Sequence, residues 1–245
     1  MKIVNILMTL VLMLTIAPAQ AQTQFILQGK VEYEKKINMH ALMGEGFWAS
    51  EMKGKLPQFR STFFDLVFDS SRSVYKSGRE VEDKYKSFWG NASTDNVTFN
   101  DYTKGQTLQQ KDVFEKTYLL QDSMLNIEWR ITAETRTIAG FECRKAVGKF
   151  MDSLYVIAFY TEQILAPGGP ESFGGLPGLI LGIGFPRIHT TWFATKLELK
   201  QVQATELGAP TKGKKATRTE ILNTVRSAVK DWGKESQATW IQAII

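Results

Sequence analysis

Residues 166–186 read APGGPESFGGLPGLILGIGFP, and this stretch decides how the rest of the chain is interpreted. Leu176-Pro177-Gly178-Leu179 has the residues of a type II turn, because proline presets φ at the first central position and glycine accepts a positive φ at the second. Leu179-Ile180-Leu181 is then predicted to enter the core as a short strand. Gly182 and Gly184 are predicted to leave room for a neighbouring group to pack closely.

The same stretch excludes several familiar loops. It lacks the Lys-Ser/Thr pair of a phosphate-binding loop and the glycine spacing of a dinucleotide-binding fingerprint. It also lacks a Gly-x-Ser-x-Gly nucleophile elbow. The glycines therefore indicate tight packing of the backbone rather than any of these sites.

Apolar residues alternate with polar ones along several other segments, as in half-buried strands. Ile127, Trp129 and Ile131 give the cleanest example, because Glu128 and Arg130 lie between them. The connections are short and carry no helical pattern, which favours antiparallel pairing of consecutive strands. The other predicted strands contain Val31 and Tyr33, Phe64 to Phe68, Phe141 to Val147, Leu154 to Thr161 and Ile188 to Val202.

One helix is predicted over residues 216–233. Thr217 to Glu220 matches a capping box, in which the Thr hydroxyl and the Glu carboxylate each accept a bond from an otherwise unpaired backbone N–H. Ile221, Val225, Ala228 and Trp232 follow at helical spacing, and Gly233 ends the run. The apolar face of this helix is expected to lie on the sheet. A shorter helix is predicted around Phe47 to Lys53.

The N-terminal residues 1–21 have the pattern of a signal peptide. Lys2 precedes an apolar run from Ile3 to Ile16, and Ala19-Gln20-Ala21 offers the small-x-small pattern that signal peptidase requires. We therefore expect an exported protein whose mature chain, residues 22–245, is one β-rich domain beginning at Gln22. No transmembrane span is expected after processing, since the run is short for a bilayer.

Composition narrows the class of partner. The 30 Lys and Arg residues less Lys2, set against 25 Asp and Glu residues, leave a mature charge of +4. Much of the excess lies between Lys212 and Lys234, where a solvated linker and helix face is expected. An exported chain of this charge meets anionic lipid or glycan rather than nucleic acid. Cys143 is the only cysteine, so no intramolecular disulfide can form.

The chain resembles the GLPGLI family of exported Gram-negative proteins, which is named after the hexapeptide Gly175-Leu176-Pro177-Gly178-Leu179-Ile180. Ile138 to Ala146 is similar to the family's Ile-x-Gly-aromatic-x-Cys-x-Lys-Ala segment. Phe159 to Ile164 resembles its aromatic-Tyr-Thr strand end, and Gly169-Pro170 its Gly-Pro before the hexapeptide. The resemblance covers roughly residues 127–193. It implies a periplasmic, outer-membrane-associated or secreted protein, often considered with outer-membrane uptake systems, and no established reaction.

The expected fold class is α+β and mainly antiparallel. The strand order looks similar to lipoprotein-carrier folds, in which a curved sheet or half-barrel wraps a helix or an apolar ligand. We expect such a sheet here, with the C-terminal helix packed on it. This likeness is one of fold, and a fold does not determine function.

Three sets of residues are candidates for chemistry. Cys143 with His40 or His189 has the residue types of a nucleophile and base, but a buried strand cysteine that packs as a small apolar residue is the preferred interpretation. We therefore predict no catalytic residues.

Met39, His40 and Met43 form a soft-ligand cluster, since thioether and imidazole suit Cu(I). Methionines that fill gaps in an apolar loop are the alternative. The third set lies near the hexapeptide, where a cleft mouth lined by charged and aromatic groups is expected; solvation of a turn is its alternative. Its residues are Arg144, Glu171, Arg187, His189 and Trp192.

The sequence favours a non-enzymatic binding or accessory protein of the cell envelope, without a cofactor. An apolar small molecule on the concave face and an outer-membrane or other envelope protein are the partners considered. The alternatives are an envelope hydrolase with dispersed polar residues and a copper-binding protein using Met39, His40 and Met43. A large apolar cleft favours the first class, and converging titratable groups with shifted pKa values favour the enzyme.

Overall fold

The computed structural model describes residues 25–82, 84–85, 96–114, 116–151, 154–231 and 236–245, without the side chains of 236–239. The predicted signal peptide and the predicted first mature residue, Gln22, lie outside the described residues. None of the helices in the described part of the chain is long and apolar enough to cross a bilayer.

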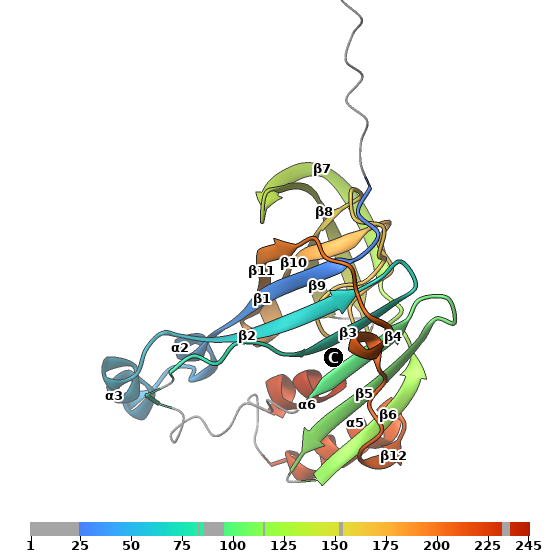
Figure 1. Cartoon of the computed structure of the whole chain (residues 1–245). Helices are drawn as coiled ribbons and strands as arrows, with labels where there is room; N and C mark the ends of the chain where they lie inside the picture. Colours follow the sequence, from blue (N-terminus) through green and yellow to red (C-terminus); the bar gives the residue numbers. More distant parts are fainter. Residues whose placement is uncertain (1–24, 83, 86–95, 115, 152–153, 232–235) are drawn as a thin grey trace, which may run out of the picture.

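The strands form one curved 12-stranded sheet with the order β12-β6-β5-β4-β3-β2-β1-β11-β10-β9-β8-β7 (Figure 1). Its strands are β1 (Gly29–Asn38), β2 (Phe59–Phe68), β3 (Arg72–Ser77), β4 (Val97–Asp101), β5 (Gln106–Val113), β6 (Lys116–Ser123), β7 (Glu128–Ile138), β8 (Phe141–Phe150), β9 (Leu154–Thr161), β10 (Leu179–Phe185), β11 (Thr190–Glu198) and β12 (Lys214–Ala216). β12 pairs with β6 in parallel, and the other pairs are antiparallel. The expected α+β class with a curved, mainly antiparallel sheet is confirmed.

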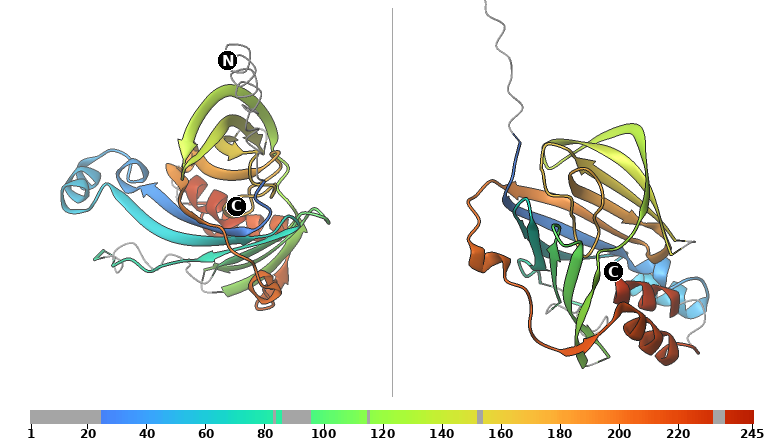
Figure 2. Two further views of the ribbon diagram at one scale, coloured as in Figure 1. Left: turned by 45° about the horizontal axis from the view of Figure 1, so that its top comes forward. Right: turned by 90° about the vertical axis from the view of Figure 1, so that its right-hand side faces the viewer.

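The sheet consists of two meanders. Strands β1 to β6 pair in sequence order, and so do β7 to β11. The ladder between β1 and β11 joins them, with Lys35 opposite Trp192. Figure 2 shows the sheet wrapping around the C-terminal helices.

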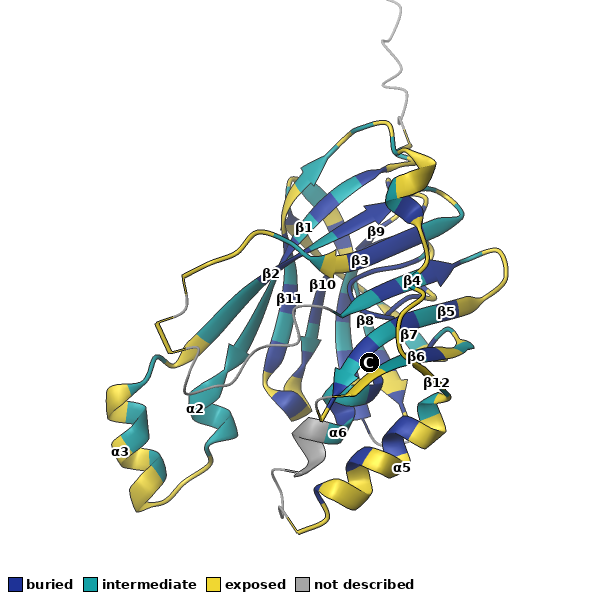
Figure 3. Ribbon diagram, turned by 60° about the horizontal axis from the view of Figure 1, so that its bottom comes forward, coloured by how far each residue is buried: buried dark blue, intermediate teal, exposed yellow. Residues whose placement is uncertain are grey.

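The helices lie at two places. α2 (Met39–Leu42) and α3 (Phe47–Lys55) form an arm between β1 and β2, while α5 (Arg218–Ala228) and α6 (Ser236–Ile244) lie against the sheet (Figure 3). The short 3-10 helices η1 (Pro186–Ile188) and η2 (Ala204–Leu207) flank β11. Figure 3 shows α3 with no buried residue and α5 with one buried side and one exposed side.

The predicted C-terminal helix is present but shorter than residues 216–233. α5 begins after its N-cap Thr217, whose capping box with Glu220 is confirmed, and it ends at Ala228. Ile221 and Val225 pack with Leu120 of β6 in one buried cluster, so the apolar face lies on the sheet as expected. Trp232 and Gly233 fall outside the described residues. The second helix, α6, was not predicted.

The hexapeptide does not form the predicted type II turn. The amide of Gly178 donates to the oxygen of Leu176 at 2.8 Å, and the amide of Leu179 donates to Ile164 at 3.2 Å instead of closing a four-residue turn. Pairing with a distant segment therefore replaces the local bond. Gly178 still needs glycine, because its φ is 151° and a Cβ there would lie 2.1 Å from the oxygen of Thr161.

Of the other local expectations, the close packing at Gly182 is confirmed, and those for Gly184 and for one strand are wrong. A Cβ on Gly182 would lie 2.7 Å from the ring of Phe193, as the predicted close packing requires, but Gly184 faces open space. The predicted strand from Ile188 to Val202 is only Thr190–Glu198. It begins after His189 because η1 ends there with His189 in a left-handed conformation at φ 47°.

Candidate functional site

The concave face of the sheet carries a buried polar surface on β3, β4 and β5. The register places Tyr75 opposite Thr98 and Thr98 opposite Gln109, so these side chains share one face. The next row contains Ser73, Asn100 and Thr107 in the same way. All six side chains are buried, with exposed fractions of 0–2%. A core face this polar requires internal hydrogen bonds, because an unpaired buried polar group costs free energy.

Glu171 lies at the centre of a charged cluster against this surface. Its Oε1 lies 3.1 Å from Lys35 Nζ, and Lys35 also lies 5.0 Å from the ring centre of Trp192. Burial alone raises the pKa of Glu171, but the charges of Lys35 and Lys111, the hydrogen bond from Lys35 and the nearby indole N–H of Trp192 outweigh it and lower the pKa. Glu171 is therefore ionised at neutral pH.

The backbone at Glu171 is unusual as well as its side chain. Its φ is 53°, a left-handed conformation that non-glycine residues rarely adopt. Such conformations persist where the surrounding structure determines them, and they cluster at functional sites. The positive φ supports treating this loop as part of a candidate site.

Lys111 of β5 is the second cation of the cluster. It is 3% exposed, and among the ion pairs of the described residues none includes its ammonium group. Burial lowers the pKa of Lys111 to about 8, although the charge of Glu171 opposes this shift. Lys35, Lys111 and Glu171 together carry one net positive charge when all three are ionised.

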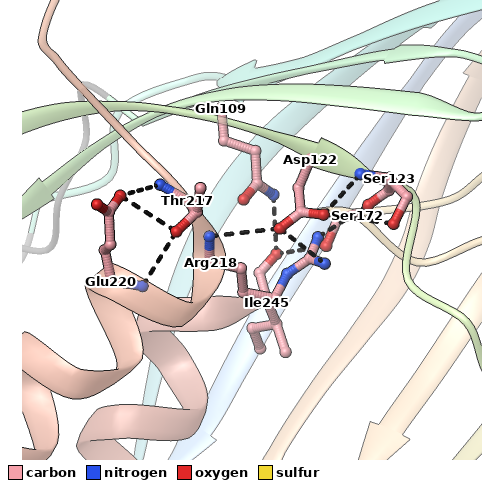
Figure 4. A network of polar contacts seen from close by, with 8 residues as sticks. All are labelled: Gln109, Asp122, Ser123, Ser172, Thr217, Arg218, Glu220 and Ile245. Atoms are coloured by element: carbon pink, nitrogen blue, oxygen red, sulfur yellow. Dashed lines mark hydrogen bonds and ion pairs between the residues drawn. The ribbon is translucent and has the colours of Figure 1, made fainter.

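The last turn of α6 covers this cluster. Ser172 Oγ donates to the main-chain oxygen of Ile245 at 2.8 Å, and Gln109 Nε2 donates to the same oxygen at 3.1 Å (Figure 4). Lys111 Nζ donates to the oxygen of Ala243 at 3.4 Å. Ile244 is fully buried in the main core beside these contacts.

Some polar atoms of the site have no hydrogen-bond partner among the described residues. These atoms are Tyr75 Oη, Asn100 Oδ1, Gln109 Oε1 and Trp192 Nε1. Trp192 is near enough to Glu171 to lower the pKa of that carboxyl, but it makes no hydrogen bond of good geometry. The site thus has unused hydrogen-bonding capacity.

An ion pair fixes the N-terminal end of α5 next to the site. Arg218 Nη1 lies 3.6 Å from Asp122 Oδ2, and its Nη2 donates to the oxygen of Ser123 at 3.1 Å (Figure 4). Because Arg218 has this anion as partner, its charge needs no ligand. Lys111 differs, because it belongs to no ion pair among the described residues.

The structure brings together two of the five predicted binding residues. Glu171 and Trp192 meet in the buried cluster. Arg144 is exposed on β8, where it lies 3.6 Å from Glu162, and Arg187 and His189 are exposed at the end of η1. The expected cleft mouth is therefore not a single site.

Sequence reasoning missed Lys35, Gln109, Lys111 and Ser172. A signal was present in β5, whose sequence QTLQQKDV alternates with Thr107, Gln109 and Lys111 on one face. Strands were predicted from alternating apolar residues, whereas the buried side chains of this strand are mostly polar. The partners are also distant, since Lys35 and Glu171 are 136 positions apart.

The structure does not change the interpretation of the other candidate residues, the cysteine and the methionine–histidine cluster. Cys143 is buried as expected, and burial raises the pKa of its thiol to about 11. His40 Nε2 lies 2.9 Å from the oxygen of Leu56 on the arm. Within the described residues no group of three or more His, Cys, Asp or Glu side chains is placed to hold a metal, and the copper site of Met39, His40 and Met43 stays a prediction.

One surface groove lies away from this site. It has a volume of about 680 Å³ and opens where Lys212 and Gly213 cross Lys76 of β3 and Gln110 of β5. Polar groups line much of it, so it is not the apolar cleft that ligand binding by burial alone requires.

Comparison with known proteins supports the fold and a short family match. Residues 148–182 match a family described as "Protein of unknown function (Porph_ging)". No curated protein matches the chain. Two crystal forms of PNGF-II, in space groups P21 and C2, share the fold with a TM-score of 0.52 each. Their identities are 14% and 15%, and the match covers 85% of this chain in both.

The chain spans about a third of the PNGF-II chains, 34% and 33% of their lengths. An uncharacterised conserved protein from Thermus thermophilus matches with a TM-score of 0.38 and 6% identity, over 76% of this chain and 90% of its own. At these identities the PNGF-II likeness concerns the fold alone.

Proposed function

We propose that this chain is a non-enzymatic binding protein of the cell envelope that holds an apolar ligand on the concave face of its sheet. The observation that carries the proposal is the Lys35–Glu171–Lys111 cluster, which lies with the buried polar side chains of β3 to β5 beside the main apolar core. A core built only for stability gains little from buried charges, since their desolvation offsets their attraction. A few convergent polar groups within an apolar surface are typical of ligand sites.

The family assignment is part of the proposal. The Porph_ging match at residues 148–182 contains the hexapeptide Gly175 to Ile180, which supports membership of the GLPGLI family. Export through the signal peptide 1–21, a periplasmic, outer-membrane or secreted location, and a partner among envelope proteins follow from that membership. N-terminal sequencing of the envelope fraction should begin at Gln22; a cytoplasmic chain that retains Met1 contradicts this part.

Native mass spectrometry of the protein purified from its own envelope tests ligand binding. We expect a non-covalent adduct of mainly apolar character that is lost when the protein is denatured. The control is the protein refolded from denaturant, which should carry no adduct and should regain it from an envelope lipid extract. A ligand-free protein in both preparations contradicts the proposal.

One observation favours an enzyme instead. Lys111 has a pKa of about 8 beside an ionised carboxyl, and converging groups with shifted pKa values are typical of catalytic sites. An envelope hydrolase would turn over an ester or amide substrate and lose this activity in Lys111→Met. The absence of turnover across such substrates, with ligand binding retained, supports the binding protein.

A further inference from the structure

We propose that the arm formed by α2 and α3 docks on the surface of a lipid bilayer, with the side chains of Phe47 and Trp48 inserted below the headgroups. This inference goes beyond the proposed function. The arm lies apart from the buried site on β3 to β5, so docking and the binding of a ligand at that site are independent and can fail separately (Figure 3).

The arm carries an exposed pair of aromatic side chains. Phe47 and Trp48 are 79% and 74% exposed, more than any other large apolar side chain that the structure describes. They are neighbours in the first turn of α3, and their rings lie edge to face with centres 5.9 Å apart. Each ring would bury a large apolar area on entering an apolar medium. Apolar side chains that gather on a surface in this way indicate contact with a partner.

The arm is held in shape by hydrogen bonds rather than by a core of its own. His40 Nε2 lies 2.9 Å from the oxygen of Leu56, which joins α2 to the end of α3. Lys53 Nζ donates to the oxygen of Gly44 at 2.5 Å, which joins α3 to the loop before it. No residue of either helix is buried. The arm thus keeps its aromatic side chains outside any apolar packing, an arrangement that stability alone does not explain.

The pattern of α3 favours a lipid surface over a groove in another protein. A helix that binds in a protein groove carries apolar anchors three, four and seven residues apart along one face. The residues at this spacing after Phe47 and Trp48 are mostly polar: Ser50, Glu51, Met52, Gly54 and Lys55. The apolar surface is therefore concentrated at the N-terminal turn of α3. Such a tip suits a shallow apolar layer that needs no matching groove.

The side chains of the arm fit the boundary between water and lipid. Trp48 combines an apolar ring with an N–H donor, the combination that places Trp at membrane interfaces. Lys53 and Lys55 lie in the last turn of the same helix, and their long stems let the ammonium groups stay near headgroup phosphates while the rings lie deeper. Residues 39–60 contain three Lys and Arg residues and two Glu residues, a net charge of +1. This charge favours approach to an anionic lipid surface.

The position of the arm lets it reach a flat surface. It extends beyond the paired ends of β1 and β2, where Asn38 lies opposite Phe59 (Figure 1). The tip can therefore enter the outer layer of a bilayer while the sheet stays in water.

The test measures sedimentation of the purified protein with vesicles made of equal parts of phosphatidylethanolamine and phosphatidylglycerol. The double variant Phe47→Ser, Trp48→Ser should bind about ten- to a hundredfold more weakly than the wild type, because both rings then stay out of the bilayer. The matched control is Leu27→Ser, Leu199→Ser, which should bind as the wild type does. Leu27 and Leu199 are 53% and 67% exposed, and they lie at the other end of the β1–β11 ladder.

Two further measurements do not depend on the folding of the double variant. In the unmodified protein, hydrogen exchange of the α3 amides should become slower when the vesicles are added, and that of the α5 amides should stay unchanged. The conservative variant Trp48→Phe should keep its affinity within a few-fold, because an aromatic ring still enters the bilayer. It should lose most of the quenching of tryptophan fluorescence that brominated lipid causes in the wild type.

The outcomes separate this inference from the proposed function. Equal binding of the vesicles by the wild type and the double variant, or exchange of α3 that the vesicles leave unchanged, overturns docking through the arm. Absence of binding to the vesicles overturns the lipid surface, and capture of an envelope protein by the wild type but not by the double variant would then assign the arm to a protein partner. The ligand of the concave face is tested separately, by the adduct in native mass spectrometry.

Discussion

The two halves of the sheet bury their concave faces by different means. In the apolar half, strands β8 to β11, one row of paired residues reads Ala146, Ala158, Ile183 and Trp192. In the polar half, strands β3 to β6, the corresponding row reads Tyr75, Thr98, Gln109 and Leu120. Both rows are buried to a similar degree.

The difference shows which half is organised for stability alone. Apolar rows pack against each other and need no specific partner, because the hydrophobic effect is non-directional. The polar row depends on partners from α6, the Glu171 loop and β1, which lie far away in the sequence. We therefore expect substitutions in the apolar half, apart from Trp192, to change stability alone, and those in the polar half to respond to pH and to ligands.

Gly178→Ala should give the largest loss of stability. The new Cβ would lie 2.1 Å from the oxygen of Thr161 at a φ of 151°, so strain and overpacking act together and cost about 2–6 kcal/mol. The control is Gly184→Ala, where no atom lies within 4 Å of the new Cβ. Denaturant midpoints measure both, and equal midpoints would mean that the apolar half tolerates strain at the hexapeptide.

Leu179→Ala should follow, with a loss of about 2–5 kcal/mol, since the side chain is fully buried in the main core. Leu199→Ala is the matched control, because Leu199 is 67% exposed and its loss should lie within about 0.5 kcal/mol. Neither change should depend on pH. A cost at Leu179 no larger than at Leu199 contradicts the assignment of the hexapeptide to the core.

Lys111→Met should stabilise the protein more at pH 7 than at pH 9.5. Native Lys111 has a pKa of about 8 against an ordinary value of 10.5, so the folded state of the wild type disfavours the proton. The stability contributed by Lys111 therefore rises as the pH increases from 8 to 10.5, by up to roughly 3 kcal/mol. The advantage of Met over Lys should shrink over that range in urea unfolding, whereas Lys149→Met should show a constant difference.

Glu171→Gln should cost about 1–3 kcal/mol at pH 7, because it leaves Lys35 without its ion-pair partner and removes the negative charge that acts on Lys111, although Lys35 is partly exposed to solvent. Since the folded pKa of Glu171 lies below its ordinary value of 4.5, the wild type loses this stability as the pH falls below about 4.5. The variant should approach the wild type in acid. Glu162→Gln, an exposed pair with Arg144, should change stability little at any pH.

The same difference explains what could be predicted from sequence. In the apolar half the alternation of Leu154 to Thr161 and the hexapeptide placed β9 and the start of β10 correctly. The polar half was missed, because Thr107, Gln109 and Lys111 point inward and the criterion required apolar residues there. The site was only half found for a related reason. Glu171 and Trp192 lie near the recognised motif, while Lys35 and Lys111 reach them through strand pairing that no local pattern encodes.

The ladder between β1 and β11 has a consequence for folding kinetics. Within each meander the paired strands follow one another in the sequence, so their contacts are closer along the chain than those of the β1–β11 ladder and can form earlier. The pairing of Lys35 with Trp192 joins positions that are far apart in the chain, and it cannot form before β11 has been synthesised. Until then β1 presents an open edge that can pair with other chains. The period between the completion of β1 and the arrival of β11 is therefore the one in which β1 is most exposed to pairing with another chain.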